Sequence, residues 1–264
     1  MVEIHRPGLA HGLFRIPAGA RRDSGRTKGR DHGTIYRICF SMTADLVAGT
    51  ALVPVAAASL AQVRHRRELM FALMPALFSA HQLLEVAVWA GLEGDAARVS
   101  PGVAEAAMRA YLFLAWPLLP IYMPLAVLLI DERRRAVIRP FLALGLIVSA
   151  YLGFVVLANP VQVIRHDHGL EYLTVVSHPL LWAVLYIVAV IAPLLISSYR
   201  SIVAFGVLNL VALILVAVFY MKSFASLWCF FAAGGSVLIL VHMIRRRSTT
   251  DTEDLTGPPV PVAT

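Results

Sequence analysis

Apolar side chains fall in seven long blocks that are separated by short polar segments. The blocks cover residues 43–63, 69–91, 107–130, 138–158, 178–198, 202–220 and 224–244. A helix of about 20 residues crosses the ~30 Å hydrocarbon core of a bilayer at ~1.5 Å rise per residue. Strands of a membrane barrel would instead alternate apolar and polar positions. The pattern therefore predicts an all-α integral membrane protein, a bundle of seven transmembrane helices whose partner is the lipid bilayer.

Composition and charge agree with a membrane location. Of the 264 residues, 59% are hydrophobic and 15% are charged, whereas soluble domains contain about 45–50% apolar and about 25% charged residues. The net charge of +7 is a feature of many nucleic-acid-binding proteins. Here, however, the arginines cluster beside the apolar blocks, which is typical of the signals that orient membrane helices. We therefore expect no nucleic-acid partner.

The arginine clusters predict the orientation of the bundle. They lie after the first, third, fifth and seventh blocks, at Arg64–Arg67, Arg133–Arg135, Arg200 and Arg245–Arg247. The alternate connections hold only Arg98, Arg109, Arg165 and Lys222. Because positively charged loops stay in the cytoplasm, the carboxyl terminus is expected inside and the start of the first helix outside.

The two flanking segments differ in composition from the membrane domain at 38–244. Residues 1–37 contain eight Lys or Arg against three acidic residues, and we expect this basic extension to be disordered. Its charge conflicts with an external amino terminus, so either the predicted topology is wrong or the segment is not native to the mature chain. We hypothesise that it arises from an upstream start or is a variable extension. Residues 245–264 end in an acidic segment that contains proline, and we expect them to form a disordered cytoplasmic tail.

Two ionisable residues interrupt the second apolar block. His81 and Glu85 lie four positions apart, so a helix places them on one face. Ionisable groups inside a membrane usually face the bundle interior, where they are paired or line a polar site. An imidazole and a carboxylate can bind a metal ion such as zinc or relay protons. Alternatively, the two side chains bond to each other and hold this helix against a neighbour.

Further candidate residues are expected on the outer side. They are Asp45 in the first block, His178 at the start of the fifth, and Ser226 and Cys229 in the seventh. If His178 reached His81 and Glu85, the three would leave an open coordination position, as catalytic zinc sites do. The alternative interpretations are that His178 only begins a helix before Pro179, and that Asp45 complements a helix dipole.

Other features of the sequence concern local backbone structure. Prolines crowd the third block in "WPLLPIYMP", where they should kink the helix or open backbone carbonyls. The segment "RHDHGLEY" reads as a solvated external loop between the fourth and fifth blocks. The four tryptophans, Trp89, Trp116, Trp182 and Trp228, are expected mostly near the outer side, as in an aromatic belt.

Several segments carry a family resemblance. They include "CFSMTADLVAGTALVPVAAASL", "RRELMFALMPALFSAHQLLEVAVWAGL" and "SLWCFFAAGGSVLIL". Over residues 38–244 the chain resembles a family of uncharacterised multi-spanning bacterial membrane proteins. Its members commonly begin Met-Cys-Phe-Ser and carry His-Gln-x-x-Glu in the second span. The resemblance implies a bacterial plasma (inner) membrane location and places Ile38 where the family has its initiator Met. It implies no activity.

Three classes of function remain compatible with these residues. The first is a channel, transporter or proton-coupled carrier whose pathway includes His81 and Glu85. The second is an intramembrane metal-dependent hydrolase with an outward-facing site. The third is a non-catalytic sensor or scaffold in which the polar residues only pack helices. Bound metal distinguishes the second class, and ion or solute flux distinguishes the first.

Overall fold

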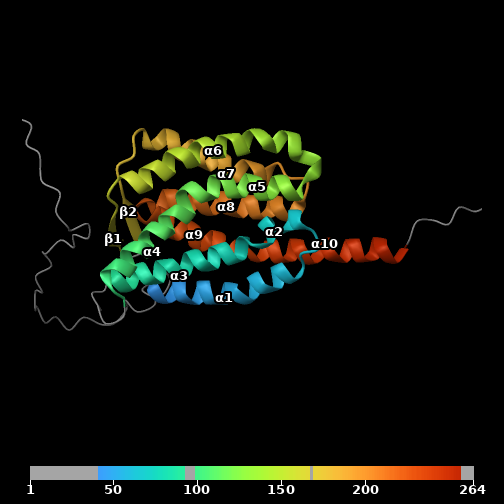
Figure 1. Cartoon of the computed structure of the whole chain (residues 1–264), viewed down its shortest axis with the longest axis horizontal. Coiled ribbons are helices and arrows are strands. Elements are labelled where there is room, and N and C mark those ends of the chain that lie inside the picture. The colour runs from blue at the N-terminus through green and yellow to red at the C-terminus, as the bar shows by residue number, and fades with distance from the viewer. Residues whose placement is uncertain (1–40, 93–98, 167–168, 257–264) are drawn as a thin grey trace, which may run out of the picture.

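Apolar helices run back and forth along one long axis in the computed structural model (Figure 1). The structure describes residues 41–92, 99–166 and 169–256. The predicted basic extension at 1–37 lies outside these residues. A small β-hairpin marks one end of the bundle, here called the hairpin end. At the opposite end α2 lies beside the connection between α5 and α6, and α10 projects beyond the other helices (Figure 1).

The helices follow the apolar blocks closely. They are α1 (Met42–Ala61), α2 (Arg66–Ala72), α3 (Met74–Leu92), α4 (Pro101–Phe113), α5 (Leu119–Ile130), α6 (Arg135–Ala158), α7 (Pro179–Leu195), α8 (Arg200–Phe219), α9 (Phe224–Gly235) and α10 (Val237–Thr256). A π-helical turn, Leu114–Leu118, joins α4 to α5, and 3₁₀ turns at Glu132–Arg134 and Met221–Ser223 precede α6 and α9. The prediction of an all-α fold is confirmed.

Six helical segments of the described chain are long and apolar enough to cross a membrane. They are Met42–Ala61, Arg66–Leu92, Pro101–Ile130, Glu132–Ala158, Arg200–Phe219 and Met221–Arg246. The remaining predicted span, the fifth apolar block at 178–198, corresponds to α7, which is apolar but has only 17 residues. It is short because Pro179 starts the helix and a polar turn at Ser197 and Ser198 follows it. The architecture is that of a multi-pass membrane protein with six such helices.

The prolines of the third span open backbone carbonyls, as the sequence predicts. Pro124 has no N–H, so the carbonyl of Pro120 loses its helical partner one turn earlier. Gly145 of α6 packs against this carbonyl, and a Cβ at Gly145 would lie 1.9 Å from the Pro120 oxygen. The Pro117 carbonyl accepts a hydrogen bond from Ser149 Oγ at 2.5 Å. The proline-rich segment is therefore the close contact between the third and fourth spans.

The predicted external loop contains a hairpin. β1 (Gln162–His166) pairs antiparallel with β2 (Gly169–Leu173), and Val163 lies opposite Tyr172. Leu170 and Tyr172 are both buried, because alternate residues of a strand face the same side. The prediction of a wholly solvated loop is wrong for this segment, since β2 points two side chains into the bundle.

Charged and hydroxyl groups close the opposite end of the bundle. Asp131, between α5 and α6, accepts hydrogen bonds from Ser197 Oγ (2.9 Å), the Ser198 backbone N–H (2.6 Å) and Ser198 Oγ (2.7 Å). Arg246 of α10 contacts Glu68 of α2, with 3.0 Å between Nε and Oε1. These contacts tie α10, α2 and the α7–α8 connection to the end of α5, and we call them the Asp131–Arg246 clasp.

The last helix is longer than predicted. We expected the membrane domain to end at residue 244, but α10 continues to Thr256. The sequence after Val237 contains no glycine or proline before Gly257 and Pro258, so nothing in its composition stops a helix earlier. The part of the predicted tail at 257–264 lies outside the described residues.

Candidate functional site

Glu85 is the centre of a buried polar cluster at the hairpin end. Its side chain is 0% exposed on α3. The Tyr172 hydroxyl of β2 donates a long hydrogen bond of 3.4 Å to Glu85 Oε1. Glu85 Oε2 has no hydrogen-bond partner among the described residues. Burial, followed by the nearby Glu85 charge, raises the pKa of the Tyr172 phenol well above its usual value, so this phenol remains a donor.

A second carboxyl, that of Asp45, lies close to the first. Asp45 is 5% exposed in the first turn of α1, and it accepts a hydrogen bond of 2.8 Å from Trp89 Nε1. The guanidinium of Arg165 lies over the Trp89 ring, 5.3 Å from its centroid. Asp45 and Glu85 are near enough to interact electrostatically. Among the described residues, neither carboxyl forms an ion pair with a basic side chain.

Close packing of α1 on α3 brings the two carboxyls together. A Cβ at Gly49 would lie 2.8 Å from the Leu83 side chain, which would have to shift, so glycine favours this close approach. Ser79 Oγ then donates a hydrogen bond of 2.7 Å to the Gly49 carbonyl. On α1 the contact is one turn from Asp45, and on α3 Leu83 is two residues and Ser79 six residues from Glu85.

Three aromatic rings form a column beside Glu85. The His81 and Tyr111 ring centroids are 3.9 Å apart, with 33° between the ring planes. Tyr111 stacks on Tyr172 at 4.7 Å and 16°. The column links α3, α4 and β2, and its two phenols lie beside the Glu85 carboxyl.

Several buried polar atoms of this cluster have no hydrogen-bond partner among the described residues. They are both ring nitrogens of His81, both amide atoms of Gln82, Glu85 Oε2 and the Tyr111 hydroxyl. Each unpaired buried group costs about 1–3 kcal/mol relative to a satisfied one. The alternative that His81 and Glu85 bond to each other is therefore wrong in this structure. The cluster has the donors and acceptors to bind a proton or a small polar group.

Helix α9 supplies the other wall of the cluster. Ser226 is 5% and Cys229 is 4% exposed, and both are neighbours of Glu85. Gly169 of β2 lies against Ser226, where a Cβ would be 3.1 Å from Oγ, and its φ of +144° is a conformation that favours glycine. Gly169 thus allows the hairpin to approach α9 and bring Tyr172 to Glu85.

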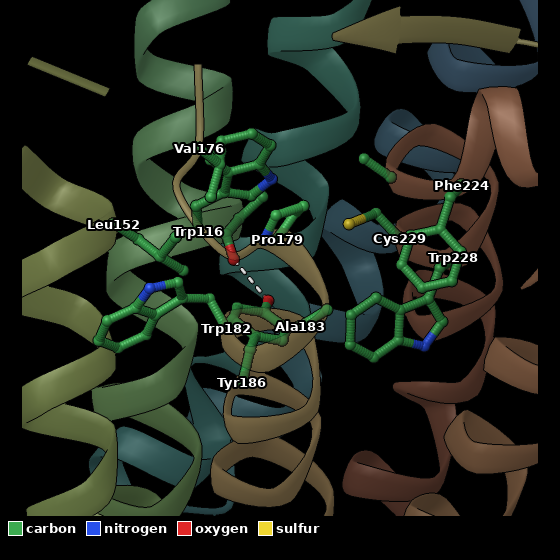
Figure 2. Close-up of a pocket in the computed structure, with 12 residues that line it drawn as sticks. Trp116, Leu152, Val176, Pro179, Trp182, Ala183, Tyr186, Phe224, Trp228 and Cys229 are labelled. Carbon is green, nitrogen blue, oxygen red and sulfur yellow. Dashed lines mark hydrogen bonds between the residues drawn. The ribbon is translucent and has the colours of Figure 1, made fainter. Parts of the chain in front are cut away.

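An apolar cavity of about 250 Å³ lies on the other side of Cys229. Figure 2 shows Ala183 and Tyr186 of α7 between Leu152 and the Trp182 ring on one side and Phe224 and Trp228 on the other. The Tyr186 hydroxyl donates a hydrogen bond of 2.6 Å to the Ala115 carbonyl in the π-helical turn. Because Cys229 borders both features, the cavity and the Glu85 cluster are adjacent.

The structure brings together five of the six candidate residues from the sequence: Asp45, His81, Glu85, Ser226 and Cys229. The sixth, His178, is exposed at the start of α7. It does not join His81 and Glu85, because it precedes the helix at the bundle surface while they lie deeper. Among the described residues, no group of three or more His, Cys, Asp or Glu side chains could hold a metal ion. The predicted zinc trio is therefore not assembled.

Sequence reasoning missed Gln82, Tyr111 and Tyr172. Gln82 directly follows His81, and a polar amide in an apolar block was a signal for it. Tyr172 could have been found from the alternation of Leu170 and Tyr172 after a glycine, which is typical of a hairpin strand. Tyr111 carried no signal, since a tyrosine in a membrane helix is equally expected at an interface.

These features define a helical bundle with the spans of a multi-pass membrane protein and a buried polar cluster beside an apolar cavity. The chain belongs to a family of unknown function (DUF6629), whose sequence model matches residues 38–254. No curated protein and no solved structure matches the chain.

Proposed function

We propose that the protein is a proton-coupled carrier of the bacterial plasma membrane and that Asp45 and Glu85 form its proton site. The observation that carries this proposal is the pair of neighbouring buried carboxyls without a basic partner in the described chain. Two negative charges in such a place repel each other and have lost their hydration. The pair therefore holds at least one proton, shared in the manner of coupled carboxyl groups.

The polar groups around Glu85 support proton transfer rather than permanent storage. Glu85 Oε2 has no hydrogen-bond partner among the described residues, so this oxygen is available to accept a proton, and the Ser226 hydroxyl lies beside the carboxyl. Tyr111 and Tyr172 supply hydroxyls beside the carboxyl. Ionisable residues placed in this way within a membrane commonly form proton pathways.

In the proposed topology the hairpin end is outside and the carboxyl terminus is in the cytoplasm. The support is the distribution of arginine, since Arg67, Arg133–Arg135, Arg200 and Arg246 all lie at the end opposite the hairpin. We take α7 as a seventh span. Its 17 residues are the shortest length that crosses a bilayer, and it runs from the hairpin end toward the clasp (Figure 1).

Proton flux and infrared spectroscopy together test the proposal. Purified protein is reconstituted with a trapped pH dye, and a potassium diffusion potential is set with valinomycin. The wild type should carry protons faster than protein-free vesicles, and Glu85→Gln should fall to the protein-free rate. Infrared difference spectra between about pH 5 and about pH 9 should show a protonated carboxyl band that Glu85→Gln removes.

Glu132→Gln is the matched control, because Glu132 is an exposed carboxyl at the opposite end. It should keep both the flux and the band. The proposal is overturned if the wild type carries protons no faster than protein-free vesicles, or if Glu85→Gln carries them as fast as the wild type.

A further inference from the structure

The apolar cavity beside Cys229 is closed on its inner side and open toward the bundle surface. The π-helical turn contributes Ala115 and Trp116 to its lining, and α6 contributes Leu152. Trp228 of α9 is only 5% exposed, whereas Ala183 on α7 is exposed. The cavity therefore extends from the outer face of α7 inward to α9.

The outer face of α7 lies where the bilayer would be. Leu180 and Leu181 are 78% and 53% exposed, and further apolar side chains follow them along the helix. In the proposed topology the material that surrounds this opening is the hydrocarbon of the membrane. Trp116 and Trp182 flank the space near the start of α7, and tryptophan is the residue that favours the boundary between hydrocarbon and headgroups.

The opening is held in place by Tyr151. Its ring stacks on Trp182 with centroids 3.9 Å apart and 8° between the planes. Its hydroxyl accepts a hydrogen bond from the Ser177 N–H at 2.9 Å and donates to the Ser177 carbonyl at 3.0 Å. The cavity is thus a preformed feature, because these contacts position both the loop before α7 and the Trp182 ring.

The lining selects hydrocarbon. It consists of aromatic and aliphatic side chains and one thiol, and the single phenol, Tyr186, already donates to the Ala115 carbonyl. A cavity of about 150 Å³ with an apolar lining stays dry and binds benzene, and this one measures about 250 Å³. It therefore has room for more than one aromatic ring, and the polar atoms of its lining side chains are only the indole N–H groups, the Tyr186 hydroxyl and the Cys229 thiol.

We infer that this cavity binds one hydrocarbon chain of a lipid that enters sideways from the bilayer, between α7 and α9. The bound chain ends beside Cys229, which also borders the Glu85 cluster, so chain and proton site are neighbours. This inference rests on the proposed function in one respect, since it makes a lipid-like amphiphile the cargo that moves with the proton.

Tryptophan quenching by brominated phosphatidylcholine tests the inference, because bromine quenches indole emission only near contact. In a Trp116→Phe, Trp182→Phe background, the remaining tryptophans are Trp89 and Trp228. Trp89 is 2% exposed and does not line the cavity, so its emission serves as an internal reference. Adding Trp228→Phe gives the Trp89 baseline. Trp228 is shielded from the surrounding bilayer, and only a chain inside the cavity reaches it.

Brominated vesicles should remove about half or more of the Trp228 emission. Ala225→Leu fills the cavity from α9 and should restore the Trp228 emission. Ala225→Val is a smaller filling variant for use if Ala225→Leu does not fold. Ala204→Leu, on the exposed face of α8, is the matched control and should leave quenching unchanged. Equal Trp228 emission in brominated and ordinary vesicles overturns the inference, and so does quenching that persists in a folded cavity-filling variant.

Glu85→Gln separates the two proposals in the same background. If it abolishes proton flux while Trp228 stays quenched, both proposals stand. Proton flux without Trp228 quenching overturns the lipid site alone. Quenching without any wild-type proton flux overturns the proposed function and leaves the chain-binding site.

Discussion

The Asp131–Arg246 clasp allows a stability prediction that is independent of the proposed function. Arg246→Met removes the guanidinium but keeps an unbranched side chain of similar reach. The Glu68 side chain is 6% and the Arg246 side chain 19% exposed, so the pair is mostly buried. Arg246 Nη1 also donates to the Ile130 carbonyl and to the Tyr199 hydroxyl, each at 3.3 Å. The substitution therefore affects α2, α5 and the start of α8 together.

The expected loss of folding free energy depends on how many partners the Glu68 carboxylate keeps after the substitution. Removing one member of a fully buried ion pair costs about 3–5 kcal/mol, and an exposed pair contributes about 1 kcal/mol or less. Glu68 keeps two hydrogen bonds after the substitution, from the backbone N–H groups of Arg64 at 3.0 Å and His65 at 3.3 Å. We therefore expect Arg246→Met to lower the free energy of unfolding by about 2–3 kcal/mol, between the two limits.

Reversible unfolding in mixed detergent micelles measures this change. Arg133→Met is the control, because Arg133 is an exposed arginine at the same end. Adding Glu68→Gln to Arg246→Met should recover about 1–2 kcal/mol, since it removes the unpaired charge. The reasoning is refuted if Arg246→Met and Arg133→Met differ by less than about 0.5 kcal/mol, the usual range for surface substitutions.

Two further predictions concern the same half of the bundle. Burial alone would raise the pKa of Asp131. The hydrogen bonds from Ser198, Ser197 and the Arg134 N–H outweigh burial and lower this pKa below its ordinary value of 3.8. Its stabilising effect is therefore complete above that value and is lost as the pH falls through the lowered pKa. Asp131→Asn should cost about 1–3 kcal/mol at neutral pH and should flatten the acid limb of an unfolding curve; an unchanged acid limb contradicts this. Gly145→Ala should destabilise by about 2 kcal/mol or more, because its Cβ would meet the Pro120 carbonyl at 1.9 Å. Gly153→Ala on the same helix, where the nearest atom is 3.6 Å away, should be neutral or slightly stabilising in the same assay. Equal effects of the two alanines would refute the packing argument.

The sequence predicts the helices well because hydrocarbon thickness sets their length. The apolar blocks at 43–63, 138–158 and 202–220 differ from α1, α6 and α8 by a few residues at most. The proline-rich third span was also predictable in kind, since a missing N–H must leave a carbonyl free. The residues that meet these carbonyls were not predictable, because Ser149 reaches the Pro117 carbonyl and Gly145 the Pro120 carbonyl only through the packing of two helices.

The candidate site was predictable where its residues lie on one helix. His81 and Glu85 share a face by spacing alone, and burial of that face follows from the cost of a charge in lipid. Their partners come from other elements, and no periodicity relates β2 or α4 to α3. His178 illustrates the limit, because sequence position gave its end of the bundle but not whether it faced the interior. The cavity had no signal at all, since it results from the relative positions of α7 and α9.

The two ends of the bundle differ in how fully the carboxyl groups of Asp131, Glu68 and Glu85 are paired, although buried polar atoms without a partner among the described residues, such as His242 Nε2, occur at the clasp as well. At the clasp, Asp131 and Glu68 each accept several hydrogen bonds or an ion pair, so separating these helices would leave charges unsatisfied. At the hairpin end, Glu85 and His81 already have unpaired atoms, and rearrangement there costs fewer hydrogen bonds. A carrier must change shape around its site, and motion is drawn from the less stable parts of a fold. For the proposed carrier, this difference predicts movement of α3, α4 and the hairpin about a fixed clasp, with the moving part around Glu85 and beside the cavity.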